Sequence, residues 1–167
     1  FPALVCGNSV VIKPSEDVPH TVHLLVELLL EAGLPPSVIQ LVHGRGKTAG
    51  QPLVEHPDVA VISFTGSTAT GSRIGETCGR MHKRLSLEMG GKNAMIVMDD
   101  ADLELALDGV LWGAFGTTGQ RCTATSRLLL HRKIHNRFLN RLADAASALV
   151  LGDGRREGTQ VGPLIHE

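Results

Sequence analysis

The sequence lacks a long apolar run, a block of like charges and a cysteine framework, and each absence excludes a class of protein. Its longest apolar runs, such as Leu24 to Leu30, which Glu27 interrupts, are far shorter than the roughly 20 residues that span a bilayer, so no membrane segment is predicted. Sixteen Lys and Arg against seventeen Asp and Glu leave a net charge of -1, which argues against nucleic acid or an anionic membrane as partner. Three widely spaced cysteines indicate a reducing, cytoplasmic setting and not a secreted disulfide scaffold.

The start of the chain also lacks the usual signals. Position 1 is phenylalanine and no basic stretch precedes an apolar run, so no signal peptide is predicted, and we expect the chain to begin inside a longer protein. No internal repeat, low-complexity tract or flexible linker interrupts the sequence.

Strand and helix patterns alternate along the chain. Short β-branched runs ending at turn residues predict strands, and apolar residues at helical spacing predict helices between them. This alternation is typical of an α/β fold with a Rossmann-like, doubly wound parallel sheet, whose ligands gather at the carboxyl ends of the strands. The predicted strands are 10–12, 38–42, 59–64, 84–87, 93–98 and 128–131, and the predicted helices are 19–33, a short one after 50, 71–81, 103–111 and 134–149.

Two glycine-rich segments follow predicted strands. The segment 63–71, with Gly66 and Ser67, leads from a strand into a helix, where free backbone N–H groups can bind a pyrophosphate. Its spacing is Gly-x4-Gly and not Gly-x-Gly-x-x-Gly, so a structural turn stays an alternative. The segment 44–48 resembles the end of a P-loop, but Leu41 occupies the place of the first glycine, which favours a plain turn.

Lys13 and Glu16 lie just beyond the first predicted strand. An ammonium and a carboxylate at this position can hydrogen-bond the two hydroxyls of an adenosine ribose, although a solvated loop is the alternative. No metal site is predicted, because zinc needs three or four ligands and the histidine pairs at 20 and 23 and at 131 and 135 have no further ligands nearby.

One carboxylate and one cysteine have surroundings suited to catalysis. Glu88 lies between apolar strand residues and a double glycine, and carboxylates in apolar settings have raised pKa values that suit general bases. Cys122 follows turn residues and precedes small ones, as expected of a thiol exposed in a cleft. Taken singly, a cysteine is more often a buried small hydrophobe, and Cys6 and Cys78 keep that interpretation.

Five motifs, read together, resemble the NAD(P)-dependent aldehyde dehydrogenase superfamily. They occur in the order and register of that family, and the resemblance continues to the closing segment 162–165. It implies that residues 1–90 are part of the NAD(P)-binding domain and that 91–167 are the first part of the α/β catalytic domain. The motifs are G-N-S-V-V-I-K-P-S-E at 7–16, A-G-L-P-P at 32–36, F-T-G-S at 64–67, L-E-M-G-G-K at 87–92 and G-Q-R-C at 119–122.

The resemblance implies cofactor contacts at four positions. Lys13 and Glu16 correspond to the adenosine-ribose contacts, and Gly66 with Ser67 corresponds to the pyrophosphate contact. Glu16 favours NAD, because a carboxylate repels the 2'-phosphate of NADP, although NADP stays possible.

The resemblance also implies a reaction. Cys122 attacks a small-molecule aldehyde to give a thiohemiacetal and then a thioester, and Glu88 acts as general base in the hydrolysis to the carboxylic acid. The oxyanion-hole asparagine and a second glutamate of the family fall outside this chain, and Thr117 stands where an asparagine is common. We therefore expect the fragment to be inactive alone, and the full-length enzyme to be a homo-oligomer.

Two alternatives stay open from the sequence. The chain could be a non-catalytic nucleotide-binding or interaction module that retains the family motifs, although such a module needs neither Cys122 nor Glu88. Arg121, beside the nucleophile, could favour an acidic semialdehyde, or it could be a structural arginine.

Overall fold

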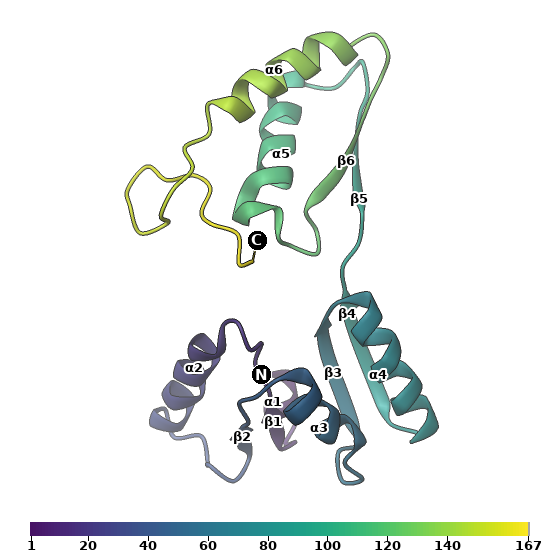
Figure 1. Cartoon of the computed structure of the whole chain (residues 1–167), viewed down its shortest axis with the longest axis vertical. Helices are drawn as coiled ribbons and strands as arrows, with labels where there is room; N and C mark the ends of the chain where they lie inside the picture. The colour runs from purple at the N-terminus through teal and green to yellow at the C-terminus, as the bar shows by residue number, and fades with distance from the viewer. Residues whose placement is uncertain (167) are drawn as a thin grey trace. The chain divides into compact units, whose positions relative to one another are not determined.

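The computed structural model describes residues 1–166, which divide into two compact units (Figure 1). The first unit comprises residues 1–65 and 69–87, and the second comprises 66–68 and the chain from Glu88 onward. The division between Leu87 and Glu88 lies close to the domain boundary predicted after residue 90. The assignment of the two parts to the cofactor and catalytic domains stays a prediction. Among the described residues, no helix is both long and apolar enough to cross a membrane.

The first unit begins with a short helix and a pair of parallel strands. Helix α1 (Pro2–Val5) was not predicted, and it precedes strand β1 (Val10–Ile12), which pairs in parallel with β2 (Ile39–Leu41). Helix α2 (Pro19–Glu31) connects the two strands. Its proline suits the first turn, where a missing N–H costs no hydrogen bond. The parallel pairing brings the carboxyl ends of β1 and β2 to the same edge.

The rest of the first unit contains a second strand pair and its helices. The turn η1 (Gly46–Gly50) leads into α3 (Gln51–Glu55), and β3 (Val61–Gly66) pairs with β4 (Arg84–Met89). Helix α4 (Thr68–Arg80) begins before its predicted start at residue 71. The apolar side chains of these elements share one core, which consists of Val54, Ile74 and Cys78 with Ile62, Phe64, Leu85 and Leu87 packed against them.

The second unit pairs β5 (Asn93–Val97) in parallel with β6 (Thr125–Leu130). Helix α5 (Leu103–Phe115) and the 3-10 turn η2 (Gly116–Gly119) connect the strands, and α6 (His135–Ser147) follows β6. Figure 1 shows α5 and α6 on the same side of the strand pair. The core between these elements consists of Val97, Leu107, Val110, Ile134 and Phe138.

The fold class is α/β, as predicted, and the strands of two pairs run parallel. In the part of the chain that the structure describes, the six strands form three separate two-stranded sheets and not one continuous sheet. Strand β6 begins at Thr125, before its predicted start at residue 128, because its first three residues, Thr125, Ser126 and Arg127, are polar and give no apolar pattern.

We expect Asp102→Ala to destabilise the protein by about 1 kcal/mol. The Asp102 side chain caps α5 by accepting hydrogen bonds from the backbone N–H groups of Glu104 at 3.0 Å and Leu105 at 3.2 Å. Alanine leaves both donors without this acceptor. The measurement is the free energy of unfolding in urea, with Asp102→Asn as the control, because its amide oxygen keeps the cap. An equal loss in both variants would show that the cap is not the cause.

Candidate active site

Cys122 lies at the exposed corner of a tight turn. The backbone N–H of Ala124 donates to the carbonyl of Arg121 at 3.0 Å, which closes a four-residue turn around Cys122 and Thr123. Ala124 is buried, whereas Cys122 is a free, exposed thiol. The turn therefore presents the Cys122 thiol outward while its last residue is anchored inside, as a nucleophile requires.

The other two cysteines differ from each other. Cys78 of α4 is 1% exposed, which confirms the buried interpretation. Cys6 is exposed, so the same prediction is wrong there. The cause is its position at the end of α1, a helix of four residues that buries none of its side chains.

Asn93, which the sequence did not single out, binds the same turn. Its side-chain nitrogen donates to the carbonyl of Cys122 at 2.6 Å and to that of Ala124 at 3.2 Å. The β5–β6 register shifts at this point, because Asn93 pairs with Thr125 and the next residue, Ala94, pairs with Arg127. The only sequence signal was a polar residue opening an otherwise apolar strand.

The segment before the turn has an unusual backbone. Thr117, Thr118 and Gly119 have φ values of 51°, 58° and 67°, in the left-handed region that β-branched residues rarely adopt. Asparagine tolerates this conformation better than threonine does. At Gly119 a Cβ would lie 2.7 Å from the carbonyl oxygen of Ala114, so only glycine fits.

Arg121 packs against helix α5. Its guanidinium carbon lies 4.9 Å from the ring centroid of Trp112, and Nη2 donates to the Trp112 carbonyl at 3.1 Å. Nε is buried and has no hydrogen-bond partner among the described residues. These contacts favour the structural interpretation of Arg121, in which the side chain holds the turn against α5.

Glu88 lies near the end of β4, on its exposed side. Leu87 and Met89 on either side are partly buried, so the predicted apolar setting exists in its flanks but does not enclose the carboxylate. Within the described residues, the Glu88 side chain makes no hydrogen bond and no ion pair, and its oxygens are free to bind water. Glu88 belongs to the same compact unit as Cys122. It precedes Asn93 by five residues, so the Cα atoms of Glu88 and Asn93 are at most about 17 Å apart.

Lys13 and Glu16 both bind the loop that follows β2. The Lys13 ammonium donates to the carbonyls of Pro14 at 2.5 Å and Gly44 at 3.1 Å, and Oε2 of Glu16 accepts from the Gly46 N–H at 3.3 Å. Where the sequence favoured a plain turn at 44–48, the structure has a bend at Gly44 followed by the π-helical turn η1, and this segment holds both predicted ribose contacts. One of the three ammonium hydrogens and the second carboxylate oxygen stay available to a ligand.

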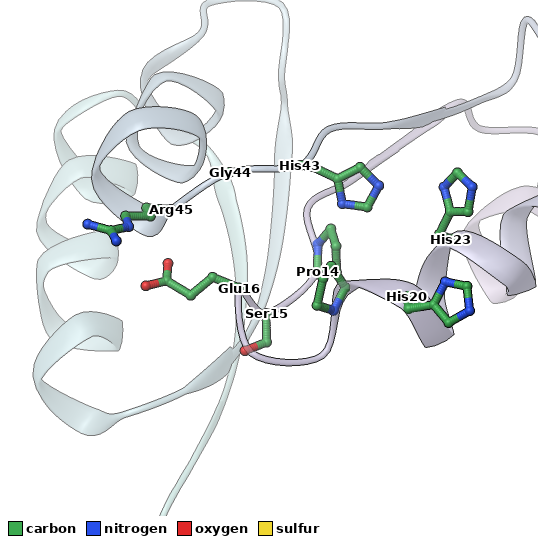
Figure 2. A pocket seen from close by; sticks show the side chains of 9 residues that line it. Pro14, Ser15, Glu16, His20, His23, His43, Gly44 and Arg45 are labelled. Carbon is green, nitrogen blue, oxygen red and sulfur yellow. The ribbon is translucent and has the colours of Figure 1, made fainter. Parts of the chain in front are cut away.

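A pocket opens at the carboxyl ends of β1 and β2 (Figure 2). Its volume of about 490 Å3 lies in the range of about 300–1,000 Å3 that is typical of small-molecule sites. Figure 2 shows Glu16 and Arg45 at one end, with both side chains extending in the same direction, and His20, His23 and His43 at the other. Among the described residues, no group of three or more His, Cys, Asp or Glu side chains is arranged to hold a metal ion. The lining residues are Pro14, Ser15, Glu16, Pro19, His20, His23, His43, Gly44 and Arg45.

Gly66 and Ser67 lie between β3 and α4. Gly66 is the last residue of β3 and Ser67 precedes the first turn of α4, which is the strand-to-helix junction that the sequence predicted. These two residues are grouped with the second compact unit, and Lys13 and Glu16 belong to the first. The predicted role of each in cofactor binding stays a prediction.

Several known proteins are similar to this chain in sequence. Phenylacetaldehyde dehydrogenase of Pseudomonas fluorescens is 48% identical over 164 residues, which are 98% of this chain and 33% of that protein. Betaine aldehyde dehydrogenase 1 of Oryza sativa subsp. japonica is 46% identical over 166 residues, 99% of this chain and 33% of its own length. The chain thus spans about a third of the length of these relatives.

Solved structures of known proteins are similar to this chain in fold. The structure of PnpE in complex with nicotinamide adenine dinucleotide matches with a TM-score of 0.96 and 49% identity, covering 99% of this chain and 34% of PnpE. Betaine aldehyde dehydrogenase from Staphylococcus aureus, in complex with NAD+, matches with a TM-score of 0.96 and 40% identity, covering 99% and 33%. The model of the aldehyde dehydrogenase family matches residues 1–167, so the chain belongs to the aldehyde dehydrogenase family.

Proposed function

We propose that the full-length protein oxidises aldehydes to carboxylic acids with NAD+, through a covalent intermediate on Cys122. The observation that carries the proposal is the exposed Cys122 thiol on a turn anchored by Ala124 and Asn93. The named relatives act on phenylacetaldehyde and betaine aldehyde, and the similar structures of PnpE and the Staphylococcus enzyme hold NAD.

The residues around the β1–β2 pocket fit a dinucleotide. The pocket lies at the carboxyl ends of parallel strands, where ligands of such sheets bind. Lys13 keeps a free donor and Glu16 a free acceptor oxygen, which together suit the two hydroxyls of a ribose. Separately from this pocket, Gly66 and Ser67 at the junction of β3 and α4 are proposed as the pyrophosphate contact, on the ground of the family motif. When bound, NAD+ supplies an acceptor for the hydride of the aldehyde carbon.

The first half of the reaction belongs to Cys122. Its thiolate Sγ adds to the aldehyde carbon and forms the C–S bond of a thiohemiacetal, whose oxygen carries the negative charge. The Cys122 backbone N–H donates to that oxygen and stabilises it. Loss of hydride from the same carbon leaves a thioester on Sγ.

The second half belongs to Glu88. Its carboxylate takes a proton from water as the water oxygen attacks the thioester carbon, the C–S bond breaks, and the carboxylic acid leaves. The exposed position of Glu88 on β4, with both oxygens free of protein partners in the described residues, leaves room for that water.

The proposal also covers the partners, the location and the cofactor of the full-length protein. Its partners are a small-molecule aldehyde and further copies of itself, with no nucleic acid and no membrane. A cytoplasmic location agrees with three free cysteines, because an oxidising compartment favours paired ones. The cofactor is NAD, with NADP possible.

The assay for this function adds NAD+ and an aldehyde to the full-length protein and follows NADH by its absorbance. Phenylacetaldehyde and betaine aldehyde are the first probes. We expect turnover with at least one of them, and little or none from the 167-residue chain alone. The competing hypothesis, a nucleotide-binding or interaction module, predicts binding of NAD+ without NADH from any aldehyde.

We expect Glu16→Gln to weaken NAD+ binding about tenfold and to narrow the preference for NAD+ over NADP+. The amide oxygen of glutamine can still accept the Gly46 N–H, so the substitution removes the charge and keeps the loop contact. A neutral side chain repels a 2'-phosphate less. The measurement is the Kd of each cofactor, with Glu31→Gln at the exposed end of α2 as the matched control. A clear preference of the unaltered protein for NADP+ would contradict the assignment of Glu16.

A further inference from the structure

Asn93 makes the most direct side-chain contact with the backbone of the nucleophile. Its amide nitrogen donates to the carbonyl of Cys122 at 2.6 Å and to the carbonyl of Ala124 at 3.2 Å. Backbone carbonyls only accept hydrogen bonds, so the nitrogen and not the oxygen of the amide must face them. Both hydrogens of the amide are thus used on one turn.

The orientation of the Cys122 carbonyl decides which type of turn the four residues form. In a four-residue turn, types I and II differ by a flip of the central peptide, which here joins Cys122 to Thr123. The flipped form needs a positive φ at Thr123, which this β-branched residue disfavours and does not adopt in the structure. Asn93 holds the oxygen of that same peptide. It therefore restrains ψ of Cys122 and, through the Cα geometry, the direction of the Cys122 side chain.

Asn93 is itself held by a rigid element. It opens β5, whose last residue, Val97, is 3% exposed in the core of the unit. The register shift after Asn93 interrupts the regular ladder, and such irregularities often re-aim a side chain beside an active site. Helix α5 also packs closely on the start of β6, since a Cβ at Gly113 would lie 2.5 Å from Oγ1 of Thr125.

We propose that Asn93 is a positioning residue, which holds the Cys122–Thr123 peptide so that the thiolate is aimed at the aldehyde carbon. This inference rests on the proposed function of Cys122. Asn93 does not touch the substrate. Its effect belongs to the attack and hydride-loss steps and not to cofactor binding.

The test compares variants of the full-length protein in rapid-mixing experiments with NAD+ and aldehyde. Asn93→Ala removes both donors, and Asn93→Asp replaces them by a carboxylate of the same shape that the two carbonyls repel. We expect the rate constant of the first NADH turnover to fall about 10- to 100-fold in both, because small misplacements of a reacting group have effects of this size. The KM for NAD+ should change less than about twofold. Asn93→Ser, which keeps one donor, should have an intermediate rate constant for the first NADH turnover.

Ser126→Ala is the matched control. Its hydroxyl donates to the Asn93 carbonyl at 3.4 Å across the same strand pair but does not contact the Cys122 turn. We expect its first-turnover rate to equal that of the unaltered protein. The rate of Cys122 alkylation by iodoacetamide gives a second readout without substrate, and it should fall in Asn93→Ala and Asn93→Asp.

The outcomes separate the two hypotheses. If the unaltered protein forms no NADH, or forms it equally well after Cys122→Ala, the proposed function fails. If the unaltered protein turns over and the folded Asn93→Ala and Asn93→Asp variants keep its first-turnover rate, the positioning role is refuted and the function stands. A lowered Tm with an unchanged rate per folded molecule refutes it as well, because that pattern marks a purely structural residue. If Asn93→Ala does not fold, Asn93→Ser and Asn93→Asp decide by the same rate.

Discussion

Cys122→Ala in the full-length protein is expected to lower NAD+-dependent aldehyde oxidation by roughly 10^4-fold or more, as loss of a covalent nucleophile does in other enzymes. Alanine keeps the backbone of the turn, including the carbonyl that Asn93 binds at 2.6 Å, so the fold should be retained. No other group in the turn can form the C–S bond. The measurement is kcat/KM for aldehyde, with the Kd of NAD+ as a check that the pocket persists.

Cys6→Ala is the control for this prediction. Cys6 is also exposed and free, so a general effect of removing a reactive surface thiol would show in both variants. We expect Cys6→Ala to retain full activity. Equal losses in the two variants, or substantial oxidation by Cys122→Ala, would contradict the assignment of the nucleophile.

Glu88→Gln is expected to stall the enzyme after one turnover and to lower kcat about 10^2- to 10^4-fold. The amide cannot take a proton from water, whereas Cys122 can still form the thioester. Rapid mixing should therefore show a burst of about one NADH per site, followed by a slow steady state. The amplitude of the burst distinguishes slow hydrolysis from slow acylation, since slow acylation abolishes the burst.

Glu104→Gln is the matched control. Glu104 is an exposed carboxylate of α5 in the same compact unit, and its side chain bonds Arg141 of α6 and not a residue of the Cys122 turn. We expect its steady state to equal that of the unaltered protein. If Glu88→Gln shows no burst but a uniformly slow rate, Glu88 acts before the thioester forms and the proposed order of roles is wrong.

Much of the fold could be predicted from local patterns. Proline at the start of α2 and glycine after its end, at φ 95°, mark its limits, and the run Val10–Ile12 marks β1. The predictions failed at strand starts made of polar residues and at very short helices. Thr125 and Ser126 open β6 without an apolar pattern, and α1 is too short to show a helical period. The grouping of strands into pairs depends on tertiary contacts, which a periodic pattern does not contain.

The site was predicted unevenly. The exposure of Cys122 and the position of Glu88 near a strand end followed from their sequence neighbours, whereas their catalytic roles rest on the family motifs and stay predictions. Asn93 was not found, since its contact with the Cys122 turn spans 29 positions and depends on the register shift between β5 and β6. The bonds of Lys13 and Glu16 to Gly44 and Gly46 are equally non-local.

The most direct test of the account is to locate the covalent intermediate. Glu88→Gln full-length protein is mixed with NAD+ and phenylacetaldehyde, quenched in acid to preserve thioesters, digested at acid pH and mapped by mass spectrometry. We expect one acyl group to be attached to the peptide containing Cys122, in an amount equal to the NADH burst. A burst without this adduct, or an acyl group on Cys6 or Cys78 instead, would contradict it.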